Sequence, residues 1–429
     1  VVTEDFSDEK SQVVATLDQS KQSRDTLSIM VLPTFFCNFK CVYCVEETIK
    51  EQEIYMDDDT ADSTLAWIKQ AVETMRPKNL ALRFYGGEPL MNVPTIERIA
   101  KDLYEYTLGR DIHFIIGITT NGALLTEQVV DRLAPYGLKA VKITLDGDKE
   151  AHDAKRPYLS GKGTFDRIIK NIRAVSDKIV VTIGGNFDEG NIDGMHRLLD
   201  FMKDSGLGEK IYAFDFKPIM DTIDRSDVRR AADQVHEVDN PFPDGMIPVD
   251  IPVLNGEAGQ GCGSLARVGI ESLSEGEIPE AFVKMKRAIV DHGFKTPPGL
   301  GHVGCSMTLS ETAFIVDPLG KIYNCPPLVG REEFSIGDVW QGLNGKYEKF
   351  LSLDVWNTDH CLSCTYVPMC GSGCRYEAYL KTGDIYAPDC EKEFFERAVP
   401  EMIKFEYEKS QANMIAEEQT VENGSFVEA

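Results

Sequence analysis

The sequence predicts an α/β fold: a partial barrel of six β/α units, followed by a small cysteine-rich domain. Strand-like apolar runs alternate with helical patterns six times between residues 26 and 218, and this succession is typical of a parallel sheet. Ten of the eleven cysteines gather in two clusters, at 37–44 and 305–390. The two clusters indicate where the chemistry of the chain is concentrated.

The six units follow one another in order. Helix signals include acceptors at 57–60, ahead of apolar residues at three- and four-residue steps. Six such units form an open relative of the eight-unit barrel, with functional groups at the carboxyl ends of the strands. The predicted strands are 26–33, 79–85, 112–119, 139–145, 179–185 and 211–218, and the predicted helices are 57–75, a stretch around Ile96–Leu103, 126–137, 164–176 and 191–204.

Composition excludes several classes of function. The net charge is −25 without a long Lys/Arg block, which argues against nucleic-acid binding. No apolar run approaches the roughly 18 residues of a membrane helix, and no secretory signal is visible. We therefore expect a cytoplasmic protein without a membrane partner. Its cysteines then favour metal binding or catalysis over disulfides.

The first cysteine cluster reads "TFFCNFKCVYCVE" and directly follows the first predicted strand. Its spacing is Cys37-x3-Cys41-x2-Cys44. Thiolates suit zinc and iron–sulfur clusters, and a four-iron cluster usually takes four cysteines. With three, one iron would keep an open position for a small molecule. A structural zinc site is the alternative, and it would need a fourth ligand.

Polar and glycine residues end the next three strands, at the same predicted edge. The second strand ends in "GGEP", where Gly86 and Gly87 would let a ligand approach the backbone and Glu88 could accept from an amino group. Asn121 follows the third strand and Thr144 ends the fourth. The stretch after the fourth strand adds Asp146, His152, for which we expect a structural role, and Arg156.

The triplet with its aromatic residue before the last cysteine, followed one unit later by "GGEP", resembles the radical S-adenosylmethionine (SAM) enzymes over about 26–220. The resemblance implies that Cys37, Cys41 and Cys44 ligate a [4Fe–4S] cluster. The amine and carboxylate of SAM would fill its fourth position, and reductive cleavage would give a 5′-deoxyadenosyl radical. The implied SAM contacts are Tyr43 at the adenine, Gly86, Gly87, Glu88 and Pro89 at the methionyl amine, and Asn121, Thr144 and Arg156 at the ribose or carboxylate.

The second cluster resembles, in every spacing, the seven-cysteine SPASM domain that carries two auxiliary [4Fe–4S] clusters. The resemblance implies three clusters in all. Cys262 or a substrate thiolate could complete the nearer auxiliary cluster, although Cys262 could also be a plain buried thiol; spacing alone would also allow a zinc knuckle at 361–374. The implied ligands are Cys361, Cys364, Cys370 and Cys390 for the distal cluster, and Cys305, Cys325 and Cys374 for the nearer one.

These features divide the chain into five predicted segments. A Pro- and Gly-rich stretch with few cysteines separates the barrel from the cysteine-rich part. The last residues form an amphipathic helix and an acidic tail. The segments are an N-terminal extension (1–25), the radical SAM partial barrel (26–221), a connecting region (222–300), the SPASM domain (301–395), and the C-terminal helix and tail (396–429).

The function we expect is oxidative modification of a ribosomally synthesised peptide, such as a cross-link or thioether. The partners would be that peptide or protein substrate, a flavodoxin- or ferredoxin-type reductant and, since only 36 residues precede Cys37, a separate leader-binding protein. Sulfatase maturation is an alternative, but those enzymes carry an acidic residue where Pro326 stands. Radical chemistry on a small molecule or sugar, and a non-enzymatic iron–sulfur or metal-binding protein, are the others.

Overall fold

The computed structural model describes residues 22–44, 53–219, 278–297, 310–352, 358–370 and 373–424, with isolated positions before residue 22. The predicted N-terminal extension and connecting region fall largely outside these ranges. Cys262 and Cys305 therefore lie outside the described residues, so their predicted roles remain predictions. Pro368 and the residues from 410 onward are described by backbone only.

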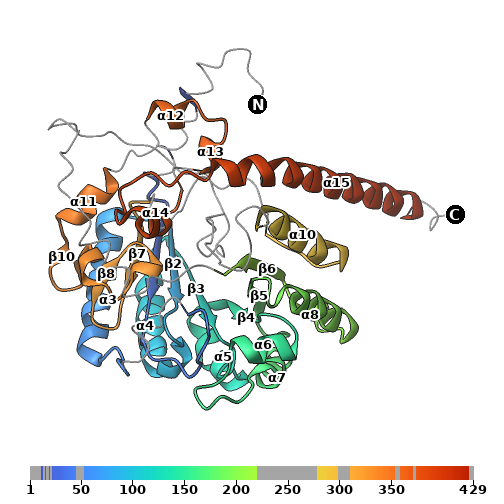
Figure 1. The fold of residues 1–429 in the computed structure, drawn as a ribbon. Coiled ribbons are helices and arrows are strands. Elements are labelled where there is room, and N and C mark those ends of the chain that lie inside the picture. Colours follow the sequence, from blue (N-terminus) through green and yellow to red (C-terminus); the bar gives the residue numbers. More distant parts are fainter. Residues whose placement is uncertain are drawn as a thin grey trace.

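One ten-stranded sheet organises the described residues, in the order β10-β9-β8-β7-β1-β2-β3-β4-β5-β6 (Figure 1). Strands β1 to β6 are parallel throughout, which confirms the predicted α/β fold. Their bounds are β1 (Thr26–Val31), β2 (Asn79–Phe84), β3 (His113–Thr120), β4 (Leu138–Thr144), β5 (Val180–Phe187) and β6 (Ala213–Pro218).

Helices cover one face of these strands, here called the outer face. On β2, Leu80, Leu82 and Phe84 are buried in the same core as Ile68 and Ile96. Alternate residues point to the opposite face, here called the inner face, and are only partly buried. The helices are α3 (Asp58–Met75), α4 (Val93–Thr107), α5 (Glu127–Leu133), α6 (Lys149–Lys155), α7 (Phe165–Val175) and α8 (Ile192–Asp204), with 3-10 turns η1 (Pro89–Asn92), η2 (Ala134–Tyr136) and η3 (Gly208–Lys210).

Local sequence explains most of these boundaries. Asp57 caps α3, because its side chain accepts from the Thr60 N–H at 2.8 Å. The predicted helix at 126–137 ends at Gly137, whose φ of +98° suits glycine. Helix α6 was not predicted. It spans only seven residues, too few to show an amphipathic period, and Asp148 caps it.

The C-terminal part joins the same sheet. The predicted hairpin around Gly320 is present, as antiparallel β7 and β8, and β7 runs parallel to β1. The Leu32 N–H donates to the Val316 carbonyl at 2.8 Å just beyond that pairing. The added strands are β7 (Ala313–Val316), β8 (Lys321–Tyr323), β9 (Gly337–Asp338) and β10 (Gly342–Leu343), followed by α11 (Gly345–Leu351), α12 (Asp359–Leu362), α13 (Val367–Cys370) and α14 (Arg375–Thr382), with 3-10 turns η4 (Pro326–Leu328) and η5 (Glu332–Phe334).

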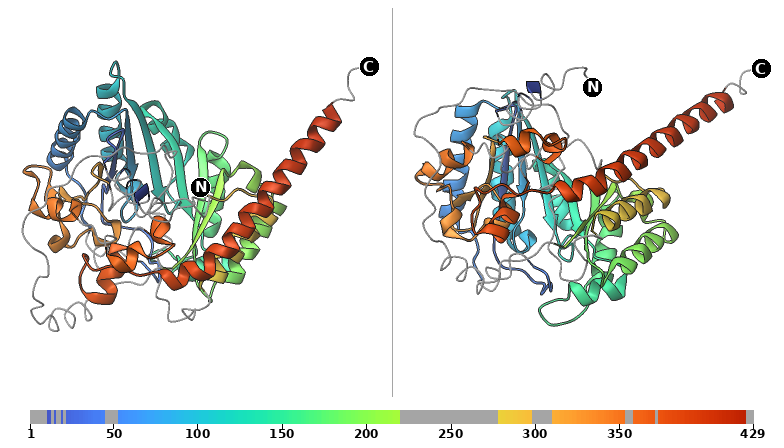
Figure 2. Two further views of the ribbon diagram at one scale, coloured as in Figure 1. Left: turned by 90° about the horizontal axis from the view of Figure 1, so that it is seen from above. Right: turned by 45° about the horizontal axis from the view of Figure 1, so that its top comes forward.

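Two further helices lie beside β6. Helix α10 (Ile278–Asp291) packs against α15 (Lys392–Gly424). Arg397 of α15 pairs with Glu280 of α10 at 2.9 Å, and Phe282 and Phe395 share an apolar cluster. Beyond this contact α15 extends away from the rest of the chain (Figure 2). Across the described ranges, each helix is too short or too polar to cross a membrane.

Candidate functional site

The loop that carries the first three cysteines leaves the carboxyl end of β1 and is held by a segment after α6. The Lys40 N–H donates to the Pro157 carbonyl at 2.8 Å, and the Val42 N–H donates to the Lys155 carbonyl at 3.0 Å. These bonds fix the backbone on both sides of Cys41. The shape of the loop therefore depends on residues that follow the fourth strand.

The Gly-Gly stretch after β2 presses against the same loop from another side. The Glu88 N–H donates to the Phe36 carbonyl at 3.0 Å. A Cβ atom at Gly87 would lie 2.2 Å from the Phe35 carbonyl oxygen and 2.4 Å from that of Phe36. Gly86 adopts a φ of +119°, which side chains rarely allow. Both glycines are thus required for this close approach.

The Glu88 carboxylate is fully buried and engaged by the protein. It accepts from the Leu90 N–H at 3.0 Å, the Thr120 hydroxyl at 2.6 Å and the Asn121 N–H at 2.7 Å. Burial raises the pKa of Glu88, while these three donors lower it. Because these donors occupy its side chain, we expect the "GGEP" stretch to offer backbone oxygens to a ligand's amine.

Asn121, at the end of β3, reaches the cysteine loop. Its amide nitrogen donates to the Asn38 side-chain oxygen at 2.8 Å and lies 4.0 Å from the Cys37 sulfur. The Phe39 N–H also donates to that sulfur, at 3.4 Å. The Asn121 side-chain oxygen accepts from the Ala123 N–H. Asn121 therefore couples the edge of the sheet to the first cysteine.

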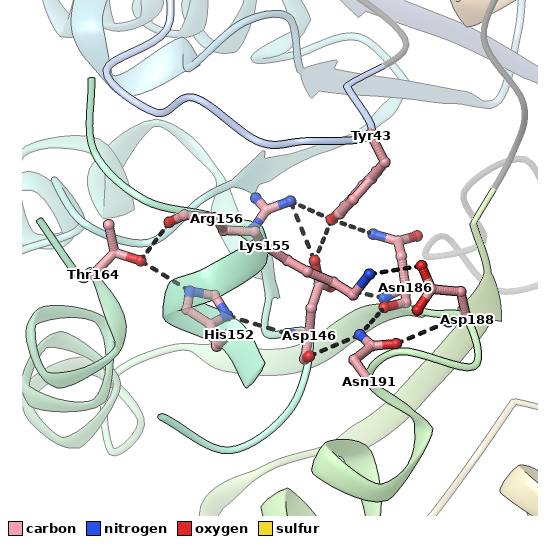
Figure 3. A network of polar contacts seen from close by, with 9 residues as sticks. All are labelled: Tyr43, Asp146, His152, Lys155, Arg156, Thr164, Asn186, Asp188 and Asn191. Carbon is pink, nitrogen blue, oxygen red and sulfur yellow. Dashed lines mark hydrogen bonds and ion pairs between the residues drawn. The ribbon is translucent and has the colours of Figure 1, made fainter. Parts of the chain in front are cut away.

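Tyr43 is the centre of a polar network (Figure 3). Its hydroxyl donates to the Asp146 carboxylate, and accepts from Arg156 Nη1 at 2.6 Å and Asn186 Nδ2 at 3.0 Å. The Asn186 N–H donates to the other Asp146 oxygen at 2.8 Å. One donated and two accepted bonds saturate the hydroxyl, so the ring next to Cys44 is fixed in position.

His152 supports this network from behind. Its Nδ1 accepts from the Asp146 N–H at 3.1 Å, so the proton lies on Nε2, which donates to the Thr164 hydroxyl at 3.0 Å. That hydroxyl donates to the Arg156 carbonyl at 2.8 Å. Burial, with the nearby Arg156 charge, holds the pKa of His152 well below its ordinary value. His152 is a neutral link between Asp146 and Arg156.

Arg156 is buried with one donor in reserve. Its guanidinium lies 3.8 Å from the Asp146 carboxylate, and within the described part of the chain its Nε has no hydrogen-bond partner. Buried donors are normally paired, so this N–H suits an anionic ligand. Thr144 lies nearby in sequence, as the last residue of β4. The structure thus brings the predicted candidates Tyr43 and Arg156 into contact.

The donor set of the triplet fits a multi-iron cluster. Burial and the Glu88 charge raise the pKa of Cys37 to about 12, so its thiolate needs a cation beside it. In the ranges described, no three His, Cys, Asp or Glu side chains converge on a single ion. A four-iron cluster does not need that convergence, because each thiolate binds a different iron.

The C-terminal cysteines fall into two neighbourhoods. Cys325 and Cys374 are buried in one apolar cluster, and the Cys374 N–H donates to the buried Asp389 carboxylate at 3.0 Å. Cys390 lies 3.7 Å from the ring nitrogen of His360, next to Cys361 in the chain. The nine cysteines within the described ranges are all free thiols. Cys364 follows Cys361 by one turn, and Cys370 ends α13.

Three features of the site escaped the sequence prediction. Asp146 was noted at the strand edge without a role, Asn186 was not considered, and the segment 155–159 was not expected to hold the cysteine loop. The available signal was weak: Asn186 and Asp146 are polar residues at the ends of neighbouring strands. Their meeting at Tyr43 is a tertiary contact that local patterns do not encode.

Comparison with known proteins identifies the barrel. Residues 31–202 match the family model of the radical SAM superfamily, which confirms the resemblance drawn from the triplet and "GGEP". The chain is 24% identical over 372 residues to the radical SAM cyclopropyl synthase TigE of Paramaledivibacter caminithermalis, covering 82% of this chain and 68% of TigE. It is 24% identical over 395 residues to a cysteine-type anaerobic sulfatase-maturating enzyme of Clostridium novyi, covering 88% and 96%.

Solved structures share the fold. The enzyme anSMEcpe, solved with AdoMet and the Cp18Cys peptide, aligns with a TM-score of 0.60 at 18% identity, covering 89% of this chain and 98% of that one. SuiB of Streptococcus suis, bound to S-adenosylmethionine, aligns with a TM-score of 0.55 at 16% identity, covering 89% and 80%. The sheet and its C-terminal additions therefore form a known arrangement.

Proposed function

Because this chain carries a radical SAM domain, which implies SAM and a [4Fe–4S] cluster, we propose that it oxidatively modifies a ribosomally synthesised peptide. The observation that carries the proposal is the convergence of three elements on the cysteine loop. These are the Gly-Gly stretch after β2, the end of β3 at Asn121, and the Tyr43 network at the ends of β4 and β5.

Cys37, Cys41 and Cys44 would hold the cluster. When bound, the reduced cluster and SAM supply a 5′-deoxyadenosyl radical that abstracts hydrogen from the substrate. Around them the chain's own residues orient SAM. The backbone at Gly86 and Gly87 lies within reach of an amine at the triplet, and Tyr43 would present its fixed ring to the adenine.

Arg156 would bind the SAM carboxylate, using the Nε donor that lacks a partner among the described residues. Thr144, Asn121 and Pro89 complete the predicted contacts at the edge. Asp146 does not need to touch SAM, because it acts through Tyr43.

We propose two auxiliary clusters in the C-terminal part. Cys325 and Cys374, which share one buried neighbourhood, would join Cys305 at the nearer cluster. Cys361, Cys364, Cys370 and Cys390 would hold the distal one, with Cys390 beside His360. These clusters would carry the substrate's second electron outward to a flavodoxin- or ferredoxin-type partner.

A peptide substrate is supported by the relatives. The aligned anSMEcpe was solved with the Cp18Cys peptide, and SuiB was solved with its precursor peptide SuiA. Sulfatase maturation is the second candidate, favoured by the coverage of the Clostridium novyi enzyme. Against it, Pro326 opens a 3-10 turn after Cys325, where the maturases carry an acidic residue.

The test is a mass measurement under anaerobic turnover. The reconstituted enzyme, with reductant and SAM, is incubated with the short peptides encoded beside its gene, and separately with a sulfatase peptide. Loss of two hydrogens from an encoded peptide, located by fragmentation, supports the proposal. An aldehyde on the sulfatase peptide alone would instead establish the second candidate. Unchanged masses and unchanged stereochemistry in all peptides would overturn both.

A further inference from the structure

The inner face of the parallel strands carries an excess of positive charge. Arg83 on β2, Lys142 on β4, and Asp215 and Lys217 on β6 occupy positions that alternate with residues buried against the helices. Asp215 is the one acidic residue in the six fully described strands β1 to β6. This face is unusual in a chain whose net charge is −25.

Lys142 reaches across an intervening strand. Its Nζ lies 2.5 Å from Asp215 Oδ2, although β5 separates β4 from β6. The crossing depends on Gly184 of β5, because a Cβ atom there would lie 2.5 Å from Lys142 Cε. The lysine is therefore laid over bare backbone, and its cation is held at the middle of the inner face.

The remaining cations surround the same carboxylate. Lys217 Nζ lies 3.7 Å from Asp215 Oδ2, so two lysines share one acid. Burial lowers the pKa of Lys142; Asp215 opposes this, while the Lys217 and Arg83 charges lower it further. Three cations on these strands thus face one carboxylate, and a second carboxylate would be attracted to them.

The cluster adjoins the SAM side of the site. Lys217 is the register partner of Asn186, and the Asn186 side chain donates to the Tyr43 hydroxyl. Substrate that approaches the cysteine loop from inside the barrel would therefore meet Lys217 one strand away from the Tyr43 network.

We propose that Arg83, Lys142 and Lys217 bind a carboxylate of the substrate and orient it below the cysteine loop. The inference rests on the proposed function only in placing the substrate inside the barrel. The carboxylate could belong to an acidic side chain of the peptide or to its carboxyl terminus. Either source offers the charge-assisted hydrogen bonds that lysine and arginine make.

The test measures binding to the reconstituted, SAM-loaded enzyme without reductant, by isothermal titration calorimetry. The probes are three short peptides that share one sequence: one with a central glutamate and blocked ends, the same with glutamine, and the glutamine peptide with a free terminal carboxylate. The enzymes are wild type, Lys217→Met, Lys142→Met, Asp215→Asn, and Lys178→Met. Lys178 pairs with Asp131 on the surface before β5 and serves as the matched control.

We expect the glutamate peptide, or the free-terminus peptide, to bind about tenfold or more tightly than the blocked glutamine peptide, the value of a charged contact. Lys217→Met and Lys142→Met should remove that preference, Lys178→Met should keep it, and Asp215→Asn should strengthen it. A misfolded variant would not strengthen binding. Equal binding of all three peptides, or a preference that survives both lysine changes, would overturn the inference. Because no turnover is involved, a failure of SAM cleavage would count against the proposed function alone.

Discussion

The Tyr43 hydroxyl donates to the fully buried Asp146 carboxylate, and Arg156 and Asn186 both donate to that hydroxyl. This contact joins the cysteine loop to the ends of β4 and β5. A carboxylate is needed because the hydroxyl must donate while it accepts twice. The same carboxylate lies beside the Arg156 guanidinium, so it serves both predicted SAM contacts.

Asp146→Asn should therefore weaken SAM binding without changing the size of the side chain. The amide would present a donor to a hydroxyl that already accepts twice, and Arg156 would lose its buried counter-charge. We expect affinity for SAM to fall about tenfold, since a charged hydrogen bond is worth about 1.5–3 kcal/mol. Equilibrium dialysis with SAM measures this. Asp131→Asn, at an exposed ion pair with Lys178, is the control, and equal affinities in both variants would refute the assigned role.

Gly87→Ala should prevent the close approach of the Gly-Gly stretch to the cysteine loop. The added methyl group would overlap the carbonyl oxygens of Phe35 and Phe36, which are backbone atoms and cannot turn away. We expect a large loss of the iron–sulfur absorption after reconstitution. Gly117→Ala on β3 is the matched control, because its Cβ would meet only the Ala140 carbonyl, at 3.8 Å. Equal cluster content in the two variants would show that the contact is not needed.

Glu88→Gln should destabilise the fold more than a typical surface change. The glutamate accepts from Leu90, Thr120 and Asn121 through both oxygens, and glutamine has only one acceptor oxygen. A buried N–H left unpaired costs about 1–3 kcal/mol. Urea denaturation should show this loss, with Glu97→Gln, at a surface pair with Arg132, changing the free energy of unfolding by less than about 1 kcal/mol. Equal stabilities would mean that solvent reaches the Glu88 site.

Asp317 makes the stability of the hairpin depend on pH. Burial raises its pKa from 3.8 to about 6, although the N–H groups of Lys321 and Leu319 lower it. The folded state then holds the proton more tightly than the unfolded state. The stabilisation from this proton is complete below about pH 4 and is lost as the pH rises through about 6.

Asp317→Asn should remove this dependence, since its amide oxygen can still accept from Leu319 and Lys321. We expect the variant to be more stable than wild type at pH 7 by on the order of 3 kcal/mol, and to lose that advantage toward pH 4. Denaturant titrations between these pH values measure the difference. A constant difference across the range would show that Asp317 does not titrate as its burial indicates.

The sequence predicted the repeating part of the fold well, because each β/α unit carries its own periodic pattern. The strand at 79–85 and the helix at 57–75 differ from the structure by one residue at one end. The pairing of β7 with β1 was not predicted, since strand partners are chosen by long-range contacts. "TAFIV" reads as a strand, but nothing local says which strand lies beside it.

The site was predicted in its ligands and missed in its supports. Tyr43 and Arg156 were named because they stand in or near recognisable motifs. Asp146, which positions both, carries no motif and becomes visible only when the ends of β4 and β5 meet. The clamp of Lys155 and Pro157 on the cysteine loop is likewise a backbone contact, which side-chain patterns do not predict.

The central claim is that the triplet holds a cluster that cleaves SAM. The most direct test is release of 5′-deoxyadenosine under anaerobic reduction, compared between wild type and the variant with Cys37→Ala, Cys41→Ala and Cys44→Ala. Far-ultraviolet circular dichroism would establish that both are folded. The account predicts release by wild type and none by the variant. Equal release from the folded variant, or none from wild type with its full iron content, would contradict it.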